Sequence, residues 1–587
     1  MQEARPQAAI ESRTEVADGM RILWDVPVAM EDGIVLRADI FLPQKEGRYP
    51  ALLSYGPYAK GLPFQQGFKG GWDRLVRNFP DVARGTSNKY ANFEVVDPQK
   101  WVPDGYACVR FDSRGAGRSP GYLDPKSERE TEDMYQCIEW AAAQAWCSGK
   151  VGLSSISYYA TNQWYAACTQ PPHLAAICPW EGAADYYREN SRHGGILCDF
   201  LRMLYPWAVH RVQHGVGERG PRNPNNGELV AGPPTLPEAE LVANRKDVPA
   251  SLLAHEMDDP YYSDRSTKWD KVTVPMLSAA NWGGMGLHPR GNFEGFMRAA
   301  SSEKYLEVHG DSHWTHFYTD YGVALQKKFF GHYLKGEDTG WAKQPRVQLN
   351  VRHVDRFVVR GEHEWPLART QWTPYYLHGD KSLSASQPAG GTQLTYEPTG
   401  DGLRFLTAPF ERETEITGPV AARLFVSSAS SDADLFLVLH CYAPDGTEVV
   451  FQGSNDPHVP IGLGWLRASH RKLDPALTQP WRPYHTHDEK QPLQPGVPVQ
   501  LDVEVWPTCI VVPAGYRIGL SVRGKDYQWE GGPPVKLEGI GYEMGGVGPF
   551  RHDNPADRPP QVFSRPVTLH LDPARPSYVL LPFIPET

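Results

Sequence analysis

The sequence predicts an α/β domain with a mostly parallel sheet, a helical segment inserted over that sheet, and a C-terminal all-β domain. Three observations lead to this fold class. Short apolar runs alternate with helical patterns up to about residue 345, the alternation is interrupted at 186–271, and long helical patterns are missing from 346 onward. Alternating strands and helices are typical of parallel sheets covered on both faces, and short strands with turn signals are typical of β-sandwiches.

The first domain is expected to comprise residues 21–185 and 272–345, after a flexible tail at 1–20. Its predicted helices include 130–145 and 161–169. Its predicted strands are 36–41, 51–55, 107–111, 151–156, 175–179, 275–280 and 305–308.

The interruption at 186–271 is predicted to be a helical cap. Apolar residues recur at helical spacing between 201 and 212, and a loop rich in Gly, Pro and Asn follows at 217–234. Because the segment lies between two sheet strands, we expect it to cover the carboxyl edge of the sheet, where insertions commonly shape binding sites.

Residues 346–587 are predicted to form a β-sandwich of jelly-roll type. Expected strands include 420–427, 435–441, 499–505 and 516–523, with turn signals such as Pro444-Asp445-Gly446 between them. No internal repeat is evident in this region.

Composition excludes several classes of protein. A net charge of -10 without a basic face argues against nucleic-acid binding, and no stretch is long enough to cross a membrane. The eight scattered cysteines lack zinc-ligand spacing, and the polar N-terminus lacks a signal-peptide pattern. We therefore expect a cytoplasmic protein without metal, cofactor, nucleic-acid or membrane partners, and a homo-oligomer is compatible with this sequence.

Ser157 is the candidate nucleophile. It lies between the apolar run 151–156 and a helical pattern that continues through Ala160 and Trp164. A strand, a sharp turn and a helix present a serine hydroxyl in the nucleophile elbow of acyl-transfer enzymes. Ser155 and Tyr159 stand where that motif has glycines, so the alternative of an ordinary serine-rich turn remains open.

His313 is the candidate general base. It belongs to a loop with His309 and His316 that follows the late strand 305–308, and it lies late in that loop, ahead of an amphipathic helix. The three histidines have ligand-like spacing, so a metal site is the alternative, but no matching cysteine or carboxylate pattern accompanies them.

Several longer motifs resemble those of the cocaine esterase and X-Pro dipeptidyl-peptidase group of serine hydrolases. The resemblance runs in order along nearly the whole chain. The motifs are QAWCSGKVG at 144–152 with Ser157-Tyr158 and Gln163-Trp164 after it, DSRGAGRSPG at 112–121, FFGHYLKG at 329–336 and LRASHR at 466–471.

This resemblance implies an α/β-hydrolase core with a helical cap and a C-terminal jelly roll. It also implies that Ser157 is the nucleophile and His313 the base. Tyr58, in Gly56-Pro57-Tyr58, matches the family tyrosine whose hydroxyl completes the oxyanion hole with the backbone N–H of Tyr158.

The catalytic acid departs from the family pattern. Gly284, in the string 280–286, occupies the position at which the family has an aspartate. Glu181 follows the strand after the nucleophile strand, so its carboxylate starts from the same sheet edge, and it is the predicted substitute. Asp185 and Glu294 are the next candidates.

The predicted activity is cofactor-independent hydrolysis of an ester or amide through an acyl-enzyme, with a small ester, amide or short peptide as substrate. An X-Pro dipeptidyl-peptidase is the alternative enzyme, and Glu256, Asp258 and Asp259 of the cap are the candidates for binding its substrate ammonium. A non-catalytic binding protein on a hydrolase scaffold is the alternative from another class, supported only by Gly284.

Overall fold

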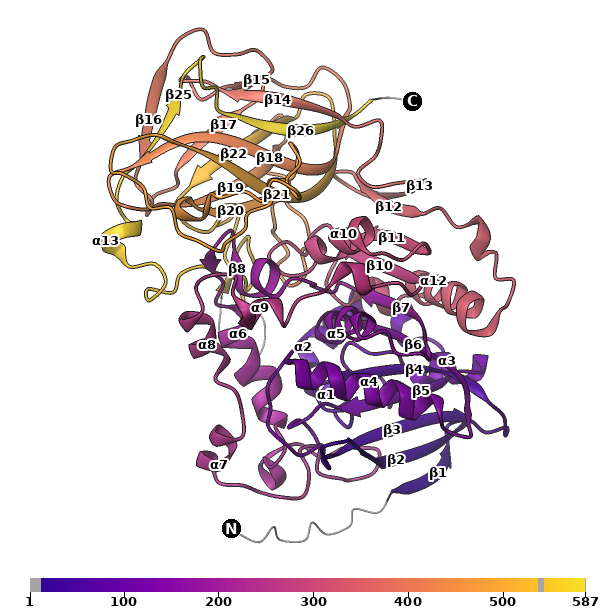
Figure 1. Cartoon of the computed structure of the whole chain (residues 1–587). Coiled ribbons are helices and arrows are strands. Elements are labelled where there is room, and N and C mark those ends of the chain that lie inside the picture. Colours follow the sequence, from indigo (N-terminus) through magenta and orange to yellow (C-terminus); the bar gives the residue numbers. More distant parts are fainter. Residues whose placement is uncertain (1–11, 537–542, 586–587) are drawn as a thin grey trace.

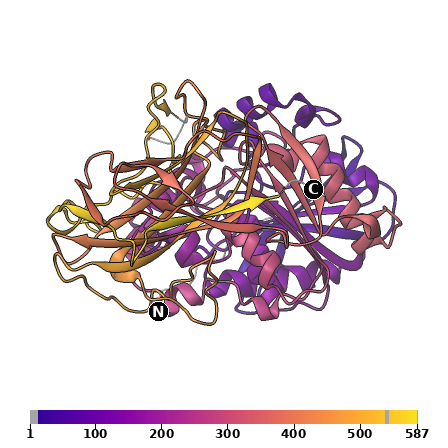
Figure 2. The same cartoon turned by 90° about the horizontal axis from the view of Figure 1, so that it is seen from above.

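The computed structural model describes residues 12–536 and 543–585. It has an N-terminal α/β domain, a cap and a C-terminal β domain stacked on both (Figure 1). Seen from above, the β domain and the α/β domain form two adjoining lobes (Figure 2). The predicted fold class is confirmed.

The N-terminal domain is built on one 11-stranded sheet, parallel in the middle and antiparallel at both ends. In sheet order its strands are β1 (Arg13–Ala17), β2 (Met20–Ala29), β3 (Val35–Pro43), β5 (Ala107–Asp112), β4 (Tyr49–Gly56), β6 (Cys147–Ile156), β7 (Leu174–Trp180), β10 (Met276–Asn281), β11 (Lys304–His309), β12 (Val347–Arg352) and β13 (Phe357–Glu362).

Alternating side chains of these strands build a hydrophobic core on each face of the sheet. Leu52 of β4 contributes to one core, and its neighbour Leu53 to the other. Helices α4 (Glu128–Ala142) and α5 (Ser157–Cys168) pack into the core that holds Leu53, whereas α12 (Asp320–Phe330) packs into the opposite one. Ser157, Glu181 and His313, described below, follow the carboxyl ends of the parallel strands β6, β7 and β11.

The remaining helices are short or lie in the cap. They are α1 (Phe64–Gly67), α2 (Lys69–Asn78), α3 (Pro98–Trp101), α6 (Phe200–Leu204), α7 (Glu238–Ala243), α8 (Val248–Ala254), α9 (Pro260–Ser263), α10 (Pro289–Arg298), α11 (Thr315–Tyr318) and α13 (Pro560–Phe563). Helices α6 to α9 and the two-stranded ribbon of β8 (Arg192–His193) and β9 (Ile196–Leu197) form the insertion between β7 and β10.

The C-terminal domain is a second, entirely antiparallel sheet that folds around its own core. Its strands are β14 (Gln371–Leu377), β15 (Leu383–Ser384), β16 (Thr392–Tyr396), β17 (Leu403–Leu406), β18 (Thr414–Ser428), β19 (Asp434–Tyr442), β20 (Gly462–Arg467), β21 (Val499–Val512), β22 (Arg517–Arg523), β25 (Val567–Leu571) and β26 (Tyr578–Ile584). A separate ribbon pairs β23 (Val535–Lys536) with β24 (Glu543–Met544).

Two predicted boundaries differ from the structure. Of the predicted tail at 1–20, residues 1–11 lie outside the described part, and Arg13–Ala17 form β1 because they pair antiparallel with β2. The domain change predicted at 345/346 comes later, because β12 pairs parallel with β11 and β13 then pairs with β12. Both strands therefore belong to the first sheet.

Candidate functional site

Ser157 lies in a sharp turn between β6 and α5. Its backbone adopts φ 60°, in the left-handed region that a residue with a side chain occupies only under strain. Its N–H donates to the carbonyl of Glu181 (3.1 Å), and the preceding Ile156 N–H donates to the carbonyl of Glu94 (2.9 Å). Hydrogen bonds from two neighbouring segments thus hold the strained turn in place, as the nucleophile-elbow interpretation requires.

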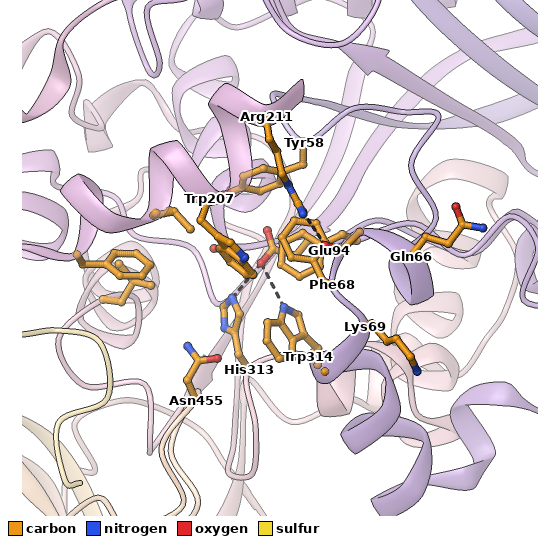
Figure 3. Close-up of a pocket in the computed structure, with 18 residues that line it drawn as sticks. Tyr58, Gln66, Phe68, Lys69, Glu94, Trp207, Arg211, His313, Trp314 and Asn455 are labelled. Atoms are coloured by element: carbon orange, nitrogen blue, oxygen red, sulfur yellow. Dashed lines mark hydrogen bonds and ion pairs between the residues drawn. The ribbon is translucent and has the colours of Figure 1, made fainter. Parts of the chain in front are cut away.

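The Ser157 turn opens into a pocket of about 230 Å³. Six of its eighteen lining residues are Phe, Tyr or Trp, and Glu94 and His313 face one another in it (Figure 3). Among the predicted site residues, Ser157, Tyr58 and His313 line it together. The other lining residues are Gln66, Gly67, Phe68, Lys69, Gly70, Gly71, Phe93, Glu94, Phe200, Leu204, Trp207, Arg211, Leu287, Trp314 and Asn455.

Glu181 and His313 form a buried hydrogen-bonded pair. The Glu181 Oε2 atom lies 2.7 Å from His313 Nδ1, and Oε1 lies 3.0 Å from His309 Nε2. Asn281 Nδ2 also donates to Oε1 (3.2 Å). Burial penalises the charge of Glu181, but its contacts with His313 and His309 outweigh that penalty and lower the carboxyl's pKa. Glu181 is therefore an anion at neutral pH.

The other nitrogen of His313 faces a second carboxylate. His313 Nε2 lies 3.3 Å from Glu94 Oε1, to which Trp314 Nε1 also donates (3.3 Å). Burial of Glu94 raises the pKa of its carboxyl. Burial alone would lower the pKa of His313, but Glu181 and Glu94 raise it to about 9.

His288 is the hydrogen-bond partner of Ser157, and the sequence reasoning missed it. The Ser157 Oγ atom lies 3.0 Å from His288 Nε2, and the N–H of Ala183 donates to His288 Nδ1 (3.0 Å). No hydrogen bond joins Ser157 to His313 among the described residues. His288 is the N-cap residue of α10. It lies in the loop after β10, for which the sequence analysis considered only the position of Gly284.

The position of Gly284 leaves little space for a side chain. A Cβ atom there would lie 3.2 Å from Pro289 Cδ and 3.3 Å from both Asn281 O and Ser454 Oγ. The loop instead turns tightly, with Gly284 N–H donating to Asn281 O (3.0 Å).

The other two candidate acids do not contact His313. Asp185 pairs with Arg188 (2.9 Å), and Glu294 pairs with Arg298 and Arg482.

Tyr58 and Tyr158 lie side by side close to Ser157, which directly precedes Tyr158 in the chain. Their ring centroids are 5.8 Å apart, and both side chains are buried. The Tyr158 hydroxyl donates to Glu130 Oε2 (2.6 Å), and neither residue lines the pocket that contains Ser157. The backbone N–H of Tyr158, in the first turn of α5, is the group predicted to contribute to the oxyanion hole.

The three cap carboxylates predicted as candidates for an ammonium site all have side-chain partners. Asp258 lies 2.7 Å from Arg188, Asp259 lies 2.6 Å from His255, and Glu256 pairs with Lys490. None of them lines the pocket that contains Ser157.

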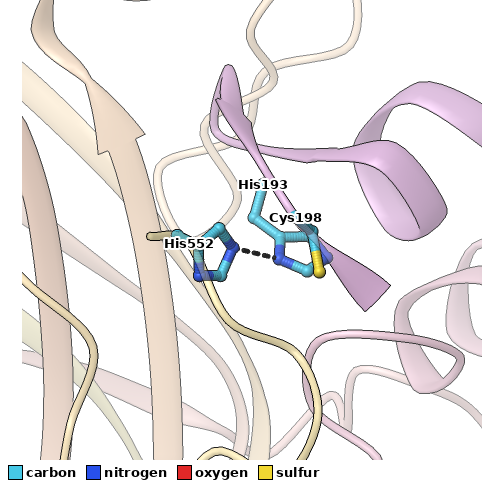
Figure 4. Close-up of side chains that lie close together, drawn as sticks. All are labelled: His193, Cys198 and His552. Atoms are coloured by element: carbon cyan, nitrogen blue, oxygen red, sulfur yellow. Dashed lines mark hydrogen bonds between the residues drawn. The ribbon is translucent and has the colours of Figure 1, made fainter. Parts of the chain in front are cut away.

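One cluster among the described residues has donor atoms close enough to share a metal ion, namely His193, Cys198 and His552 (Figure 4). It is buried between the cap and the C-terminal domain, outside the pocket. His193 Nδ1 lies only 2.7 Å from His552 Nε2, a hydrogen-bond distance, whereas two tetrahedral zinc ligands would be about 3.3 Å apart at bond lengths of about 2.0 Å. His552 Nδ1 in turn bonds Asp526 (2.8 Å). These distances are those of a hydrogen-bonded link between the cap and the C-terminal domain, not of an occupied metal site.

Two sequence profiles match almost the whole chain. That of the X-Pro dipeptidyl-peptidase (S15) family matches residues 32–318, and that of the X-Pro dipeptidyl-peptidase C-terminal non-catalytic domain matches 339–580. Cocaine esterase of Rhodococcus sp. (strain MB1 Bresler) is 27% identical over 72% of this chain and 81% of its own. A putative Xaa-Pro dipeptidyl-peptidase of Rhodopirellula baltica is 23% identical over 74% of this chain and 71% of its own.

Solved structures agree with this picture. A CocE/NonD family hydrolase of Staphylococcus aureus superposes with a TM-score of 0.83 at 29% identity, covering 98% of both chains. An α-amino acid ester hydrolase superposes with a TM-score of 0.66 at 17% identity over 97% of this chain and 98% of its own, a likeness of fold alone. Among the described residues, no helix is long and apolar enough to cross a membrane.

Proposed function

Because the chain belongs to the X-Pro dipeptidyl-peptidase (S15) family of hydrolases, we propose that Ser157, His313 and Glu181 form its catalytic triad. The observation that carries this proposal is the buried 2.7 Å contact between Glu181 Oε2 and His313 Nδ1, at the same sheet edge as Ser157. A carboxylate at Nδ1 fixes the imidazole tautomer and stabilises the imidazolium that forms during acyl transfer. His288 has a backbone N–H at Nδ1 and lacks this feature.

In acylation, His313 Nε2 accepts the Ser157 proton as Oγ attacks the carbonyl carbon. The nitrogen must exchange Glu94 for Ser157 as its partner when substrate binds, a tightening that is common between free and substrate-bound enzymes. The Tyr58 hydroxyl and the Tyr158 N–H donate to the oxyanion. His313 then protonates the leaving group, and it activates the water that releases the acid and regenerates Ser157.

We propose a carboxylic ester as the substrate. Six aromatic side chains line the pocket and suit an apolar acyl group. The relatives over long stretches of the chain include a cocaine esterase and a protein named a putative serine esterase of Mycobacterium bovis, which is 25% identical over 85% of this chain and 90% of its own. All eight cysteines are free, which supports the cytoplasmic location expected from the sequence.

One observation favours the X-Pro dipeptidyl-peptidase as a second candidate. Glu94 is only 2% exposed, and its Oε2 atom has no hydrogen-bond partner among the described residues. A substrate ammonium in the pocket would satisfy this buried oxygen. The cap carboxylates first considered for this task are already paired.

The test combines labelling with substrate profiling. A fluorophosphonate probe should label wild-type protein stoichiometrically at Ser157, read by peptide mass spectrometry, and should not label Ser157→Ala. Turnover of aryl esters but not X-Pro anilides would support the esterase. Turnover of X-Pro anilides that falls sharply in Glu94→Gln would favour the second candidate. Absence of labelling in well-folded wild-type protein would refute the triad.

A further inference from the structure

His288 occupies the place in which a triad base is expected, yet its surroundings fix it as a hydrogen-bond donor. A backbone N–H can only donate, so the Ala183 N–H bond requires a lone pair on His288 Nδ1. The neutral ring then carries its single proton on Nε2. That nitrogen lies 3.0 Å from Ser157 Oγ, so the N–H is directed at the nucleophilic oxygen.

The ring has no freedom to adopt the other tautomer or to become charged. His288 is 2% exposed and stacks against His313, with ring centroids 5.1 Å apart and planes 9° apart. Protonation at Nδ1 would break the Ala183 bond and place a cation beside His313 and near Lys126. Burial, followed by His313 and Lys126, holds the pKa of His288 well below its ordinary value.

We propose that His288 is a second catalytic histidine, which donates its Nε2–H to Ser157 Oγ throughout the reaction and does not act as a base. This inference rests on the proposed role of Ser157 as the nucleophile. The donor leaves the Ser157 proton free to point to His313, and it stabilises negative charge on Oγ whenever that charge develops.

Negative charge develops on Oγ at two points in the cycle. In acylation, Oγ gains charge as its proton moves to His313 and before its bond to the carbonyl carbon is complete. In deacylation, Oγ gains charge as it leaves the second tetrahedral intermediate and before His313 returns the proton. The Nε2–H bond stabilises both transition states and itself transfers no proton.

His288→Gln and His288→Leu separate this role from a base or a structural residue. Glutamine can place an N–H close to the former Nε2 position, whereas leucine fills space without a donor. We expect His288→Leu to lower kcat/KM for a p-nitrophenyl ester, and the rate of fluorophosphonate labelling, by about 10²-fold, as loss of one preorganised donor does. His288→Gln should stay within about tenfold of wild type.

The pH profile identifies the base. We expect the alkaline-rising limb of kcat/KM to persist in both His288 variants and to vanish in His313→Gln. His485→Leu is the matched control, because His485 is a buried histidine outside the pocket whose Nε2 has no hydrogen-bond partner among the described residues. It should retain wild-type kcat/KM.

Two kinetic results would overturn the proposal. If the rising limb vanishes in His288→Gln but survives in His313→Gln, His288 is the base. If His288→Leu reacts at the wild-type rate, the contact is structural. If His288→Leu does not fold, ¹⁵N spectra of histidine-labelled wild-type protein test the tautomer directly. The His288 signal is assigned by its loss in His288→Gln. A protonated Nδ1 would refute the donor role. A wild type that is never labelled at Ser157 refutes the triad instead, and the tautomer measurement still stands.

Discussion

The rings of His288 and His313 lie parallel, with centroids 5.1 Å and planes 9° apart, but in the neutral rings the single proton lies on opposite nitrogens. Glu181 requires an N–H at Nδ1 of His313, whereas the Ala183 N–H requires a lone pair at Nδ1 of His288. Two adjacent imidazoles therefore present opposite hydrogen-bonding character to the same site. Once His313 is unprotonated at Nε2, this relationship offers a lone pair on His313 and an N–H on His288.

Glu181→Gln should remove tautomer control of His313. We expect kcat for an ester substrate to fall by up to about 10⁴-fold, with a much smaller change in KM. Asp185→Asn is the control, since Asp185 pairs with Arg188 away from the site. Steady-state kinetics well below the unfolding temperature provide the measurement, and an unchanged kcat in Glu181→Gln would remove this residue from the triad.

Tyr58→Phe removes the side-chain donor that we assign to the oxyanion hole and keeps the ring that packs against Tyr158. We expect kcat to fall by about 10²- to 10³-fold while KM stays within a few-fold of wild type. The same kinetic assay tests this expectation. A raised KM with an unchanged kcat would instead show that Tyr58 binds the substrate and the transition state equally.

The pH profile should report the two carboxylates that face His313. The base must be unprotonated, and the pKa of His313 is raised to about 9, so kcat/KM should rise as pH increases through that value. Glu94→Gln removes one stabilising anion and should shift the inflection to lower pH. If the inflection pH of kcat/KM is unchanged in Glu94→Gln, the Glu94 side chain no longer contacts His313 at the rate-limiting step.

Gly284→Asp should not restore a missing acid. The new Cβ atom would lie within 3.3 Å of Asn281 O and Ser454 Oγ, so the substitution should lower the thermal midpoint. In combination with Glu181→Gln, it should not recover kcat. Recovery in the double variant, measured with the same ester, would contradict our account of this loop.

His309 should contribute a pH-dependent part of the stability. Burial alone would lower its pKa, but Glu307 and Glu181 raise it to about 10. Its contribution is complete below about pH 6.5 and is lost as pH rises through about 10. We expect His309→Gln to cost about 3–5 kcal/mol of unfolding free energy at pH 6, since it removes the buried cation that Glu181 and Glu307 share. Urea unfolding at pH 6 and pH 10 should show the difference from wild type shrinking at high pH.

The sequence predicted the fold because the relevant signals are local. Apolar runs fixed the parallel strands, and the strand-turn-helix pattern around Ser157 predicted the elbow. Strands β1, β2, β12 and β13, at the two ends of the sheet, were missed, because their place in it depends on pairing with neighbouring strands and their own residue pattern did not indicate it.

The site was predictable only as far as strand order allowed. Glu181 and His313 follow strands whose carboxyl ends meet at one sheet edge, and the structure brings them within 2.7 Å. His288 and Glu94 could not be found in this way, because neither directly follows a strand of the sheet. A search for titratable residues throughout the loop after β10, rather than at one position, would have detected His288.

The C-terminal domain has a consequence for enzyme engineering. Ser454 accepts a hydrogen bond from the His313 N–H (3.0 Å), and Asn455 lines the pocket. The bond between His193 and His552 ties the cap to the same domain. Truncation after β13 would therefore not yield a smaller active enzyme. It would remove Asn455 from the pocket lining, Ser454 from His313, and His552 from the cap. Shortened or chimeric versions of this hydrolase should retain both domains as one unit.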